Sequence, residues 1–217
     1  MSTIEKALAK QKQTKESTGK NLKDDTSEAA SSKVESASNV GPKKESNETL
    51  YKPDIIIDGE SLVTRGYMFD ASSRKITQEE FRQIKRKLLN NAFGPASKTL
   101  NNSNLIMVSS SNPNEGKTFV SINLALSIAL EQDKTVLLID ADVIRPSIST
   151  ELNISPRKGL VEYLLGEVSN VSEVIYNTSI SNLKIIPAGE PHHLTSELLT
   201  SDKMRQLTQE LANRYSD

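Results

Sequence analysis

Residues 105–118 constrain the fold of this chain more than any other part of its sequence. Apolar residues 105–108 lead into a polar loop, 109–115, which ends in Gly116-Lys117-Thr118 and is followed by an apolar helical pattern over 119–130. A strand, a tight loop and a helix that begins at Gly-Lys-Thr form a phosphate-binding arrangement, because main-chain N–H groups and the helix N-terminus attract anions. The sequence therefore predicts a P-loop nucleotide-binding fold.

Lys117 and Thr118 carry the most specific chemistry of this loop. Lys117 is expected to reach the β- and γ-phosphates of a nucleotide, and the Thr118 hydroxyl to face Mg²⁺. The usual motif has glycine six residues before the lysine, where this chain has Ser111. The alternative is an ordinary surface loop with a solvated lysine, but the flanking strand and helix favour a phosphate site.

A second polar motif follows the next apolar run. The predicted strand 135–140 ends in Asp140, and Asp142 comes two residues later. Ligands of α/β sheets bind at the carboxyl ends of the strands, and a carboxylate placed there beside a phosphate loop can hold Mg²⁺ or its water shell. The alternative is a pair of solvated aspartates at a strand end and a turn.

Strand and helix patterns alternate from residue 105 onward. Apolar runs typical of strands lie at 105–109, 135–140 and 183–187, and helical patterns lie at 117–131, 159–165 and 195–215. This alternation predicts an α/β fold with a doubly wound parallel sheet and right-handed crossovers.

A further helix precedes the phosphate loop. Thr77 can cap its start and Glu80 can complete a capping box, and the pattern ends near residue 91. Its apolar stripe is predicted to contain Phe81, Ile84, Leu88 and Leu89, and its basic face Arg82, Lys85, Arg86 and Lys87. We interpret the basic face as solvated or as a subunit contact, because no interleaved aromatic residues suggest binding to nucleic acid.

The N-terminal region differs sharply in composition. Residues 1–50 contain no aromatic residue and are rich in Ser, Lys, Glu and Thr, so they are predicted to be disordered, with an alternative of a short helix at 2–12. Residues 51–76 are interpreted as a transition with a short strand at 55–57, and residues 77–217 as the nucleotide-binding domain.

Composition narrows the remaining choices. The chain has 27 basic and 28 acidic residues, so nothing in its net charge indicates a nucleic-acid partner, and it has no cysteine. No secretory signal is visible, and the prediction is a cytoplasmic protein. His192 and His193 lie at no metal-ligand spacing and are interpreted as loop residues.

Several of these segments together resemble one family. Residues 110–118 and 137–147 are similar to the nucleotide motifs of bacterial tyrosine kinases of exopolysaccharide synthesis, which are relatives of the chromosome-partition and septum-site ATPases. Residues 79–86 resemble the family's Glu-x-x-Arg-x-x-Arg helix, and residues 183–189 and 196–199 resemble a later strand and loop. Residues 2–7 resemble the start of the exosortase-associated subgroup.

The resemblance implies ATP and Mg²⁺ as cofactors and assigns roles to individual residues. Thr118 and Asp140 would hold the metal, and Lys117, Asp140, Asp142 and Arg145 would serve catalysis, one aspartate helping to deprotonate the acceptor tyrosine. The nucleotide would be contacted by Ser111, Asn114, Glu115, Gly116, Lys117, Thr118 and Phe119.

The resemblance also implies a function, namely an ATP-dependent protein-tyrosine autokinase that regulates exopolysaccharide or capsule synthesis and export. Its partners would be a membrane chain-length (co-polymerase) protein, which would hold it at the inner membrane, and further copies of itself through the helix of Glu79, Arg82 and Lys85. A nucleic-acid partner is not expected.

Two further features of the family are missing from this sequence. Neither its third motif, Asp-x-Pro after an apolar strand, nor its tyrosine-rich tail occurs. The sequence is therefore expected to be a piece of a longer protein, incomplete at the C-terminus, with weak nucleotide binding and little kinase activity. The alternatives are a positioning ATPase, against which Asn112 counts because it replaces a second lysine, and a non-catalytic adaptor.

Overall fold

The structure is a computed structural model and describes residues 52–69 and 75–215 of the 217-residue chain. These residues belong to one compact unit, Glu48–Asp217. The disorder predicted for residues 1–50 and the helix at 2–12 lie outside the described residues. Among the described helices, none is long and apolar enough to cross a membrane.

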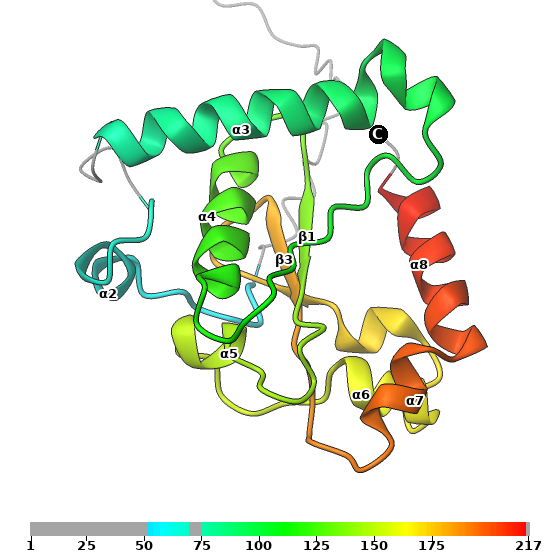
Figure 1. The fold of residues 1–217 in the computed structure, drawn as a ribbon. Coiled ribbons are helices and arrows are strands. Elements are labelled where there is room, and N and C mark those ends of the chain that lie inside the picture. Colours follow the sequence, from blue (N-terminus) through cyan, green and yellow to red (C-terminus); the bar gives the residue numbers. More distant parts are fainter. Residues whose placement is uncertain (1–51, 70–74, 216–217) are drawn as a thin grey trace, which may run out of the picture. The chain divides into compact units, whose positions relative to one another are not determined.

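A small mixed sheet lies at the centre of this unit (Figure 1). Its strands are β1 (Val136–Ile139), β3 (Leu183–Ile186) and β2 (Tyr176–Asn177), in the order β1-β3-β2. β1 and β3 are parallel, whereas β2 is antiparallel to β3. The carboxyl ends of β1 and β3 therefore meet at one edge of the sheet, where a ligand site is expected.

Helices cover both faces of the sheet, which confirms the doubly wound α/β prediction. On one face, Leu138 and Ile185 pack against α4 (Lys117–Ala129). On the other face, Ile139 and Ile186 pack in a second core with α6 (Leu160–Leu165) and α8 (Asp202–Arg214). This division follows from the alternation of side chains along a strand. The remaining short elements are α2 (Gly59–Thr64), η1 (Pro95–Thr99), α5 (Ile148–Glu151), η2 (Val171–Val174) and α7 (Thr195–Leu199).

Helix α3 (Lys75–Phe93) packs against α4, but its predicted faces were partly wrong. Phe81 is buried as expected, whereas Ile84 is 45% exposed and Lys85 only 7%. Lys85 Nζ donates to the carbonyl of Ser127 at 3.1 Å and pairs with the Glu131 carboxylate. Lys85 lies one helical turn after Phe81, so its aliphatic stem can share the buried face once its ammonium group finds polar partners.

The strand predicted at 105–109 is not formed. Leu105 and Ile106 are each 40% exposed and Met107 is 89% exposed, and residues 105–110 have no regular secondary structure. A strand needs a neighbour for its main-chain hydrogen bonds, and none of the described segments pairs with these residues.

The single helix predicted at 195–215 is also wrong, because the structure has α7 and α8 in its place. Ser201 separates them: its side chain accepts a hydrogen bond from the main-chain N–H of Met204 at 3.2 Å and so begins a new helix. Serine is among the residues preferred at helix N-caps, which explains the break.

Residues 52–69 connect the far edge of the sheet to α4. Ile55 forms an isolated parallel bridge with Thr178 beside β2, where the sequence predicted a short strand. The ring of Tyr67 packs 5.2 Å from that of Phe119 at the start of α4, and its hydroxyl donates to the Glu151 carboxylate of α5 at 2.9 Å. This segment therefore contributes to the core and clamps the two helices nearest the phosphate loop.

Replacing Tyr67 with phenylalanine is expected to lower the free energy of unfolding by about 1–2 kcal/mol at pH 7, because the hydrogen bond to a carboxylate is lost. Burial, followed by the contact with Glu151, raises the pKa of the Tyr67 hydroxyl in the folded protein. Above pH ~10 the unfolded chain loses this proton while the folded chain keeps it, so the wild type loses stability there. The difference in the free energy of unfolding between the wild type and Tyr67→Phe should therefore become smaller above pH ~10.

Urea denaturation at pH 7 and at pH values above 10 measures both effects. Tyr163→Phe is the matched control, since Tyr163 is also buried but none of the hydrogen bonds found in the described residues involves its hydroxyl. An equal loss of stability in the two variants at pH 7 would contradict the role given to the Tyr67 hydroxyl.

Candidate nucleotide-binding site

The loop before α4 is closed by its own side chains. The Glu115 carboxylate accepts hydrogen bonds from the main-chain N–H of Asn112 at 3.1 Å and from its side-chain amide at 2.8 Å. These bonds hold the pKa of Glu115 below its usual value. Ser110 Oγ also donates to the carbonyl of Asn112 at 2.9 Å. Glu115, predicted to contact the nucleotide, therefore serves first to fix the shape of the loop.

Gly116 lets the loop turn into the helix. Gly116 has a φ of 93° and Asn114 a φ of 64°, both in the left-handed region that glycine and asparagine tolerate best. Gly116 is the N-cap of α4, and the first turn of this helix carries no acidic residue. The N–H groups of the first turn have no intrahelical acceptors, so this end of α4 is suited to bind an anion.

Lys117 is the first residue of α4 and is half-buried. Its ammonium group makes no hydrogen bond or ion pair with any residue that the structure describes. The charge at the start of α4 is therefore not neutralised within this part of the chain. Ser111 is exposed in the preceding loop, and the ring of Phe119 packs into the core, so a ligand could meet only the main chain of Phe119.

Ser147 joins the two predicted motifs; it is the last residue of the segment 137–147 named above, but nothing in the sequence was a reason to assign it a role in the site. Its Oγ lies 2.5 Å from Thr118 Oγ1. The next residue, Ile148, donates its main-chain N–H to Asp140 Oδ2 at 3.1 Å. Thr118 and Asp140 are thus linked through two consecutive residues. Its place at the end of the segment 137–147 was the available signal, but a hydroxyl residue shortly after an acidic motif is too common to predict a contact with Thr118.

Asp140 is almost completely buried, with 2% of its surface exposed. Burial raises the pKa of its carboxyl group, while main-chain N–H groups that donate to it oppose this effect. One of these donors is the N–H of Asp142, 3.2 Å from Oδ1. The carboxylate therefore organises the loop that follows β1 and lies at the predicted place, the carboxyl end of this strand.

Asp142 and Arg145 lie on the outer side of this loop. Asp142 is exposed, and its Oδ1 accepts the main-chain N–H of Arg145 at 3.1 Å. The Arg145 guanidinium is exposed and is not brought to Thr118 or Asp140 by any hydrogen bond or ion pair of the described residues. The structure therefore brings Thr118, Ser147 and Asp140 together. It leaves the side chains of Asp142 and Arg145 exposed, where they could meet a substrate.

Asn123, one turn after Phe119, has a structural role in this arrangement. It is fully buried; its Oδ1 accepts the N–H of Met68 at 2.8 Å, and its Nδ2 donates to the carbonyl of Phe119 at 3.0 Å. Both ends of its amide are thus occupied, and Asn123 ties α4 to the segment before α3.

The oxygen atoms gathered at this site are of the kind that a divalent metal ion takes as ligands. The described residues contain no group of three or more His, Cys, Asp or Glu side chains able to hold a metal ion. Thr118 and Asp140 offer a hydroxyl and a carboxylate, the oxygen ligands that Mg²⁺ takes together with substrate phosphates and water.

A helix that starts at Gly-Lys-Thr, next to a strand-end carboxylate on a doubly wound sheet, defines a P-loop nucleotide-binding domain. The protein family described as an AAA domain matches residues 103–215, more than half of the chain. The chain belongs to this family, and the relatives that it matches include bacterial tyrosine kinases.

Three comparisons define the extent of this similarity. Tyrosine-protein kinase etk of Escherichia coli K12 is 40% identical over 114 residues, which are 52% of this chain and 15% of that protein. Succinoglycan biosynthesis transport protein ExoP of Rhizobium meliloti is 35% identical over 116 residues, 52% of this chain and 14% of that protein. The kinase domain of Escherichia coli ETK has a TM-score of 0.54 at 33% identity, over 64% of this chain and 51% of that domain. The chain thus spans about half of this kinase domain and a small part of the complete relatives.

Proposed function

We propose that this chain carries the nucleotide-binding part of an ATP-dependent protein-tyrosine kinase. The observation that carries the proposal is the position of Lys117 and Thr118 at the start of α4, in contact through Ser147 with the loop of the buried Asp140. The tyrosine kinases among the relatives support this reaction over other uses of a phosphate loop.

The residues of the site divide the work of phosphoryl transfer among them. Lys117 and the first-turn N–H groups of α4 would bind the β- and γ-phosphates. Thr118 and Asp140 would hold Mg²⁺, which neutralises charge on these phosphates when it is bound. Asp142 is exposed and suited to take the tyrosine proton, while Arg145 beside it can offset negative charge on the transferred group.

The reaction forms one bond and breaks one bond. The tyrosine oxygen attacks the γ-phosphorus, the bond from this phosphorus to the β–γ bridging oxygen breaks, and ADP leaves. The hydroxyl proton passes to Asp142 or to water. Because such a transfer needs little covalent help, positioning and charge neutralisation would supply most of the rate.

We further propose that the whole protein regulates exopolysaccharide or capsule synthesis and export from the cytoplasmic side of the inner membrane, where a membrane chain-length protein would hold it. The similarity to a succinoglycan biosynthesis transport protein supports this role. Self-association through α3 would use Glu79 and Arg82, which form an exposed ion pair at 2.8 Å, since Lys85 is buried against α4. Membership of the exosortase-associated subgroup stays a prediction.

The test is to incubate the protein with ATP and Mg²⁺, to measure binding with a fluorescent ATP analogue, and to detect phosphotyrosine by mass spectrometry. We expect Mg²⁺-dependent nucleotide binding by residues 1–217 and phosphotyrosine on the whole protein that contains them. ATP-dependent dimerisation and hydrolysis without phosphotyrosine would instead identify a positioning ATPase. Absence of ATP binding even in the whole protein would identify an adaptor.

A further inference from the structure

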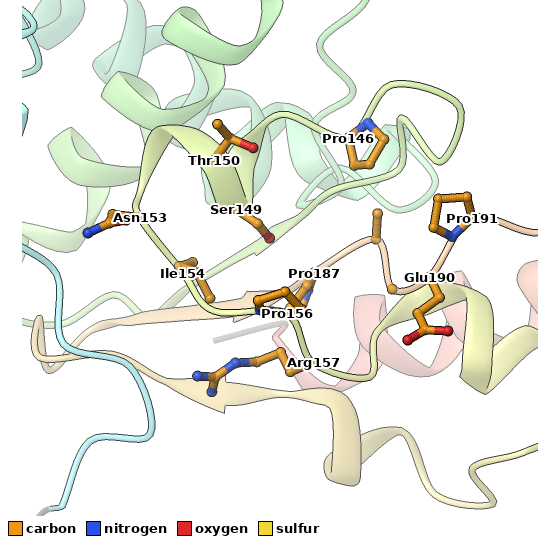
Figure 2. A pocket seen from close by; sticks show the side chains of 12 residues that line it. Pro146, Ser149, Thr150, Asn153, Ile154, Pro156, Arg157, Pro187, Glu190 and Pro191 are labelled. Carbon is orange, nitrogen blue, oxygen red and sulfur yellow. The ribbon is translucent and has the colours of Figure 1, made fainter.

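A pocket of about 380 Å³ opens between residues 146–157, a segment that includes α5, and the loop after β3. Figure 2 shows its labelled side chains, and prolines are prominent among them. The proline side chains come from both walls: Pro146 precedes α5 and Pro156 follows it, and Pro187 and Pro191 belong to the loop after β3. Because proline fixes its own φ angle and has no N–H group, these walls are stiff and largely apolar.

The pocket adjoins the nucleotide site. Pro146 and Ser149, which line it, flank the two residues that touch Thr118 and Asp140. Its other wall begins at Pro187, directly after β3, the parallel neighbour of β1. The pocket therefore lies at the carboxyl ends of the same two strands that position the acidic loop.

A buried carboxylate holds one wall in place. Glu162 of α6 is 5% exposed; its Oε2 accepts the N–H of Gly159 at 2.5 Å and its Oε1 accepts the N–H of Glu190 at 2.7 Å. Gly189 lies so close to this carboxylate that a Cβ there would collide with it. Glu162 thus fastens the loop after β3 to the start of α6, and the pocket is preformed.

Two charged side chains of opposite sign, Arg157 and Glu190, lie at the rim of the pocket. Arg157 forms no ion pair with the described residues; its Nε donates to the carbonyl of Ser155 and its Nη1 to that of Asp54, each at 3.3 Å. The guanidinium lies 4.7 Å from the ring centroid of Tyr176. Glu190 is exposed, and in Figure 2 its carboxylate and the Arg157 guanidinium extend to opposite sides of the pocket. A ligand with an acidic group toward Arg157 would complement this end.

We propose that this pocket is the subsite for the phosphoryl acceptor: it takes an extended peptide segment whose tyrosine ring lies among the prolines and whose neighbouring acidic residue pairs with Arg157. The inference rests on the proposed kinase function and adds where, and by which residues, the acceptor is recognised. The volume is at the lower end for specific ligand sites, enough for one aromatic side chain and its adjoining main chain. Asp142, the residue proposed to take the tyrosine proton, lies on the loop that leads from β1 to Pro146 at the edge of the pocket.

The probe is a short fluorescein-labelled peptide with one tyrosine and glutamates before it, titrated into the 217-residue chain while its anisotropy is followed. Arg157→Glu is expected to weaken binding of this peptide about tenfold or more, because an attraction becomes a repulsion. Ser149→Phe, which fills the pocket without changing its charge, is expected to do the same. Arg205→Glu is the matched control, since Arg205 is exposed on α8 and pairs only with Asp202 among the described residues.

Circular dichroism and binding of the fluorescent ATP analogue are measured for every variant. Retained nucleotide binding with weakened peptide binding in both pocket variants supports the proposal. Two results would overturn the proposal and leave the kinase assignment intact. One is that a peptide with alanine in place of tyrosine binds as tightly as the tyrosine peptide; the other is that both pocket variants bind the tyrosine peptide as the wild type does. Failure of the kinase assignment would instead appear as absence of ATP binding and phosphotyrosine in the whole protein.

Discussion

Replacing Lys117 with alanine is expected to weaken binding of ATP by about 100- to 1000-fold. The ammonium group sits at the first residue of α4 with no partner in the described residues, so its charge is available to the β- and γ-phosphates. A hydrogen bond to a charged group contributes about 1.5–3 kcal/mol, and loss of two such contacts corresponds to at least two factors of ten in affinity. Phosphotyrosine on the whole protein should disappear for the same reason.

Titration of a fluorescent ATP analogue with Mg²⁺ present measures this effect, and Lys98→Ala is the matched control. Lys98 is exposed in η1 and takes no part in the site, so its variant should bind as the wild type does. The free energy of unfolding should change little in either variant, because neither lysine contributes to the core. Nearly equal nucleotide affinities for the two variants would show that Lys117 does not bind the phosphates. They would contradict the assignment of this loop as a P-loop.

The elements that the sequence predicts well are those whose cause is local. Helix α4 follows from a glycine that takes a positive φ and an apolar run, and β1 from four apolar residues covered on both faces. The nucleotide motifs depend on the same local features. Their predicted positions therefore agree with the structure to within a few residues, although ligand contacts of the individual site residues stay predictions.

The errors arise where contacts distant in the sequence decide the outcome. Lys85 reads as part of a basic surface, yet the carbonyl of Ser127 and the carboxylate of Glu131 on α4 bury it. Residues 105–109 read as a strand because they are apolar, but a strand forms only against a neighbour. Short-range patterns contain neither kind of information.

The residues of the site also divide into those that a local motif reveals and those that only distant contacts reveal. Thr118 and Asp140 are recognisable because each stands in a motif, whereas Ser147 is recognisable only once the loop after β1 has folded back to Thr118. Glu162 is a further case, since it reads as an ordinary acid in a helix and is in fact a buried acceptor for two loops. Residues that position others are identified by their contacts rather than by spacing.

Replacing Gly159 with alanine is expected to lower the free energy of unfolding by about 3 kcal/mol or more. A Cβ at this position would collide with the main-chain oxygen of Pro187 and lie 2.6 Å from the main-chain nitrogen of Gly189. Main-chain atoms cannot rotate away as a side chain can. Relief would require α6 to move, which breaks the hydrogen bonds from Leu160 and Val161 to this loop at 2.8 and 2.9 Å.

Gly66→Ala separates this collision from the general effect of removing a glycine. Gly66 has a φ of 89° and no atom within 4 Å of the added Cβ, so only backbone strain of about 1–2 kcal/mol is expected there. Urea denaturation of the two variants gives the difference, which measures how tightly α6 is seated against the loop after β3. If Gly159→Ala lowers the free energy of unfolding no more than Gly66→Ala does, the contact between α6 and the loop after β3 is looser than in the structure. The wall of the proline-lined pocket that Glu162 holds would then not be rigid.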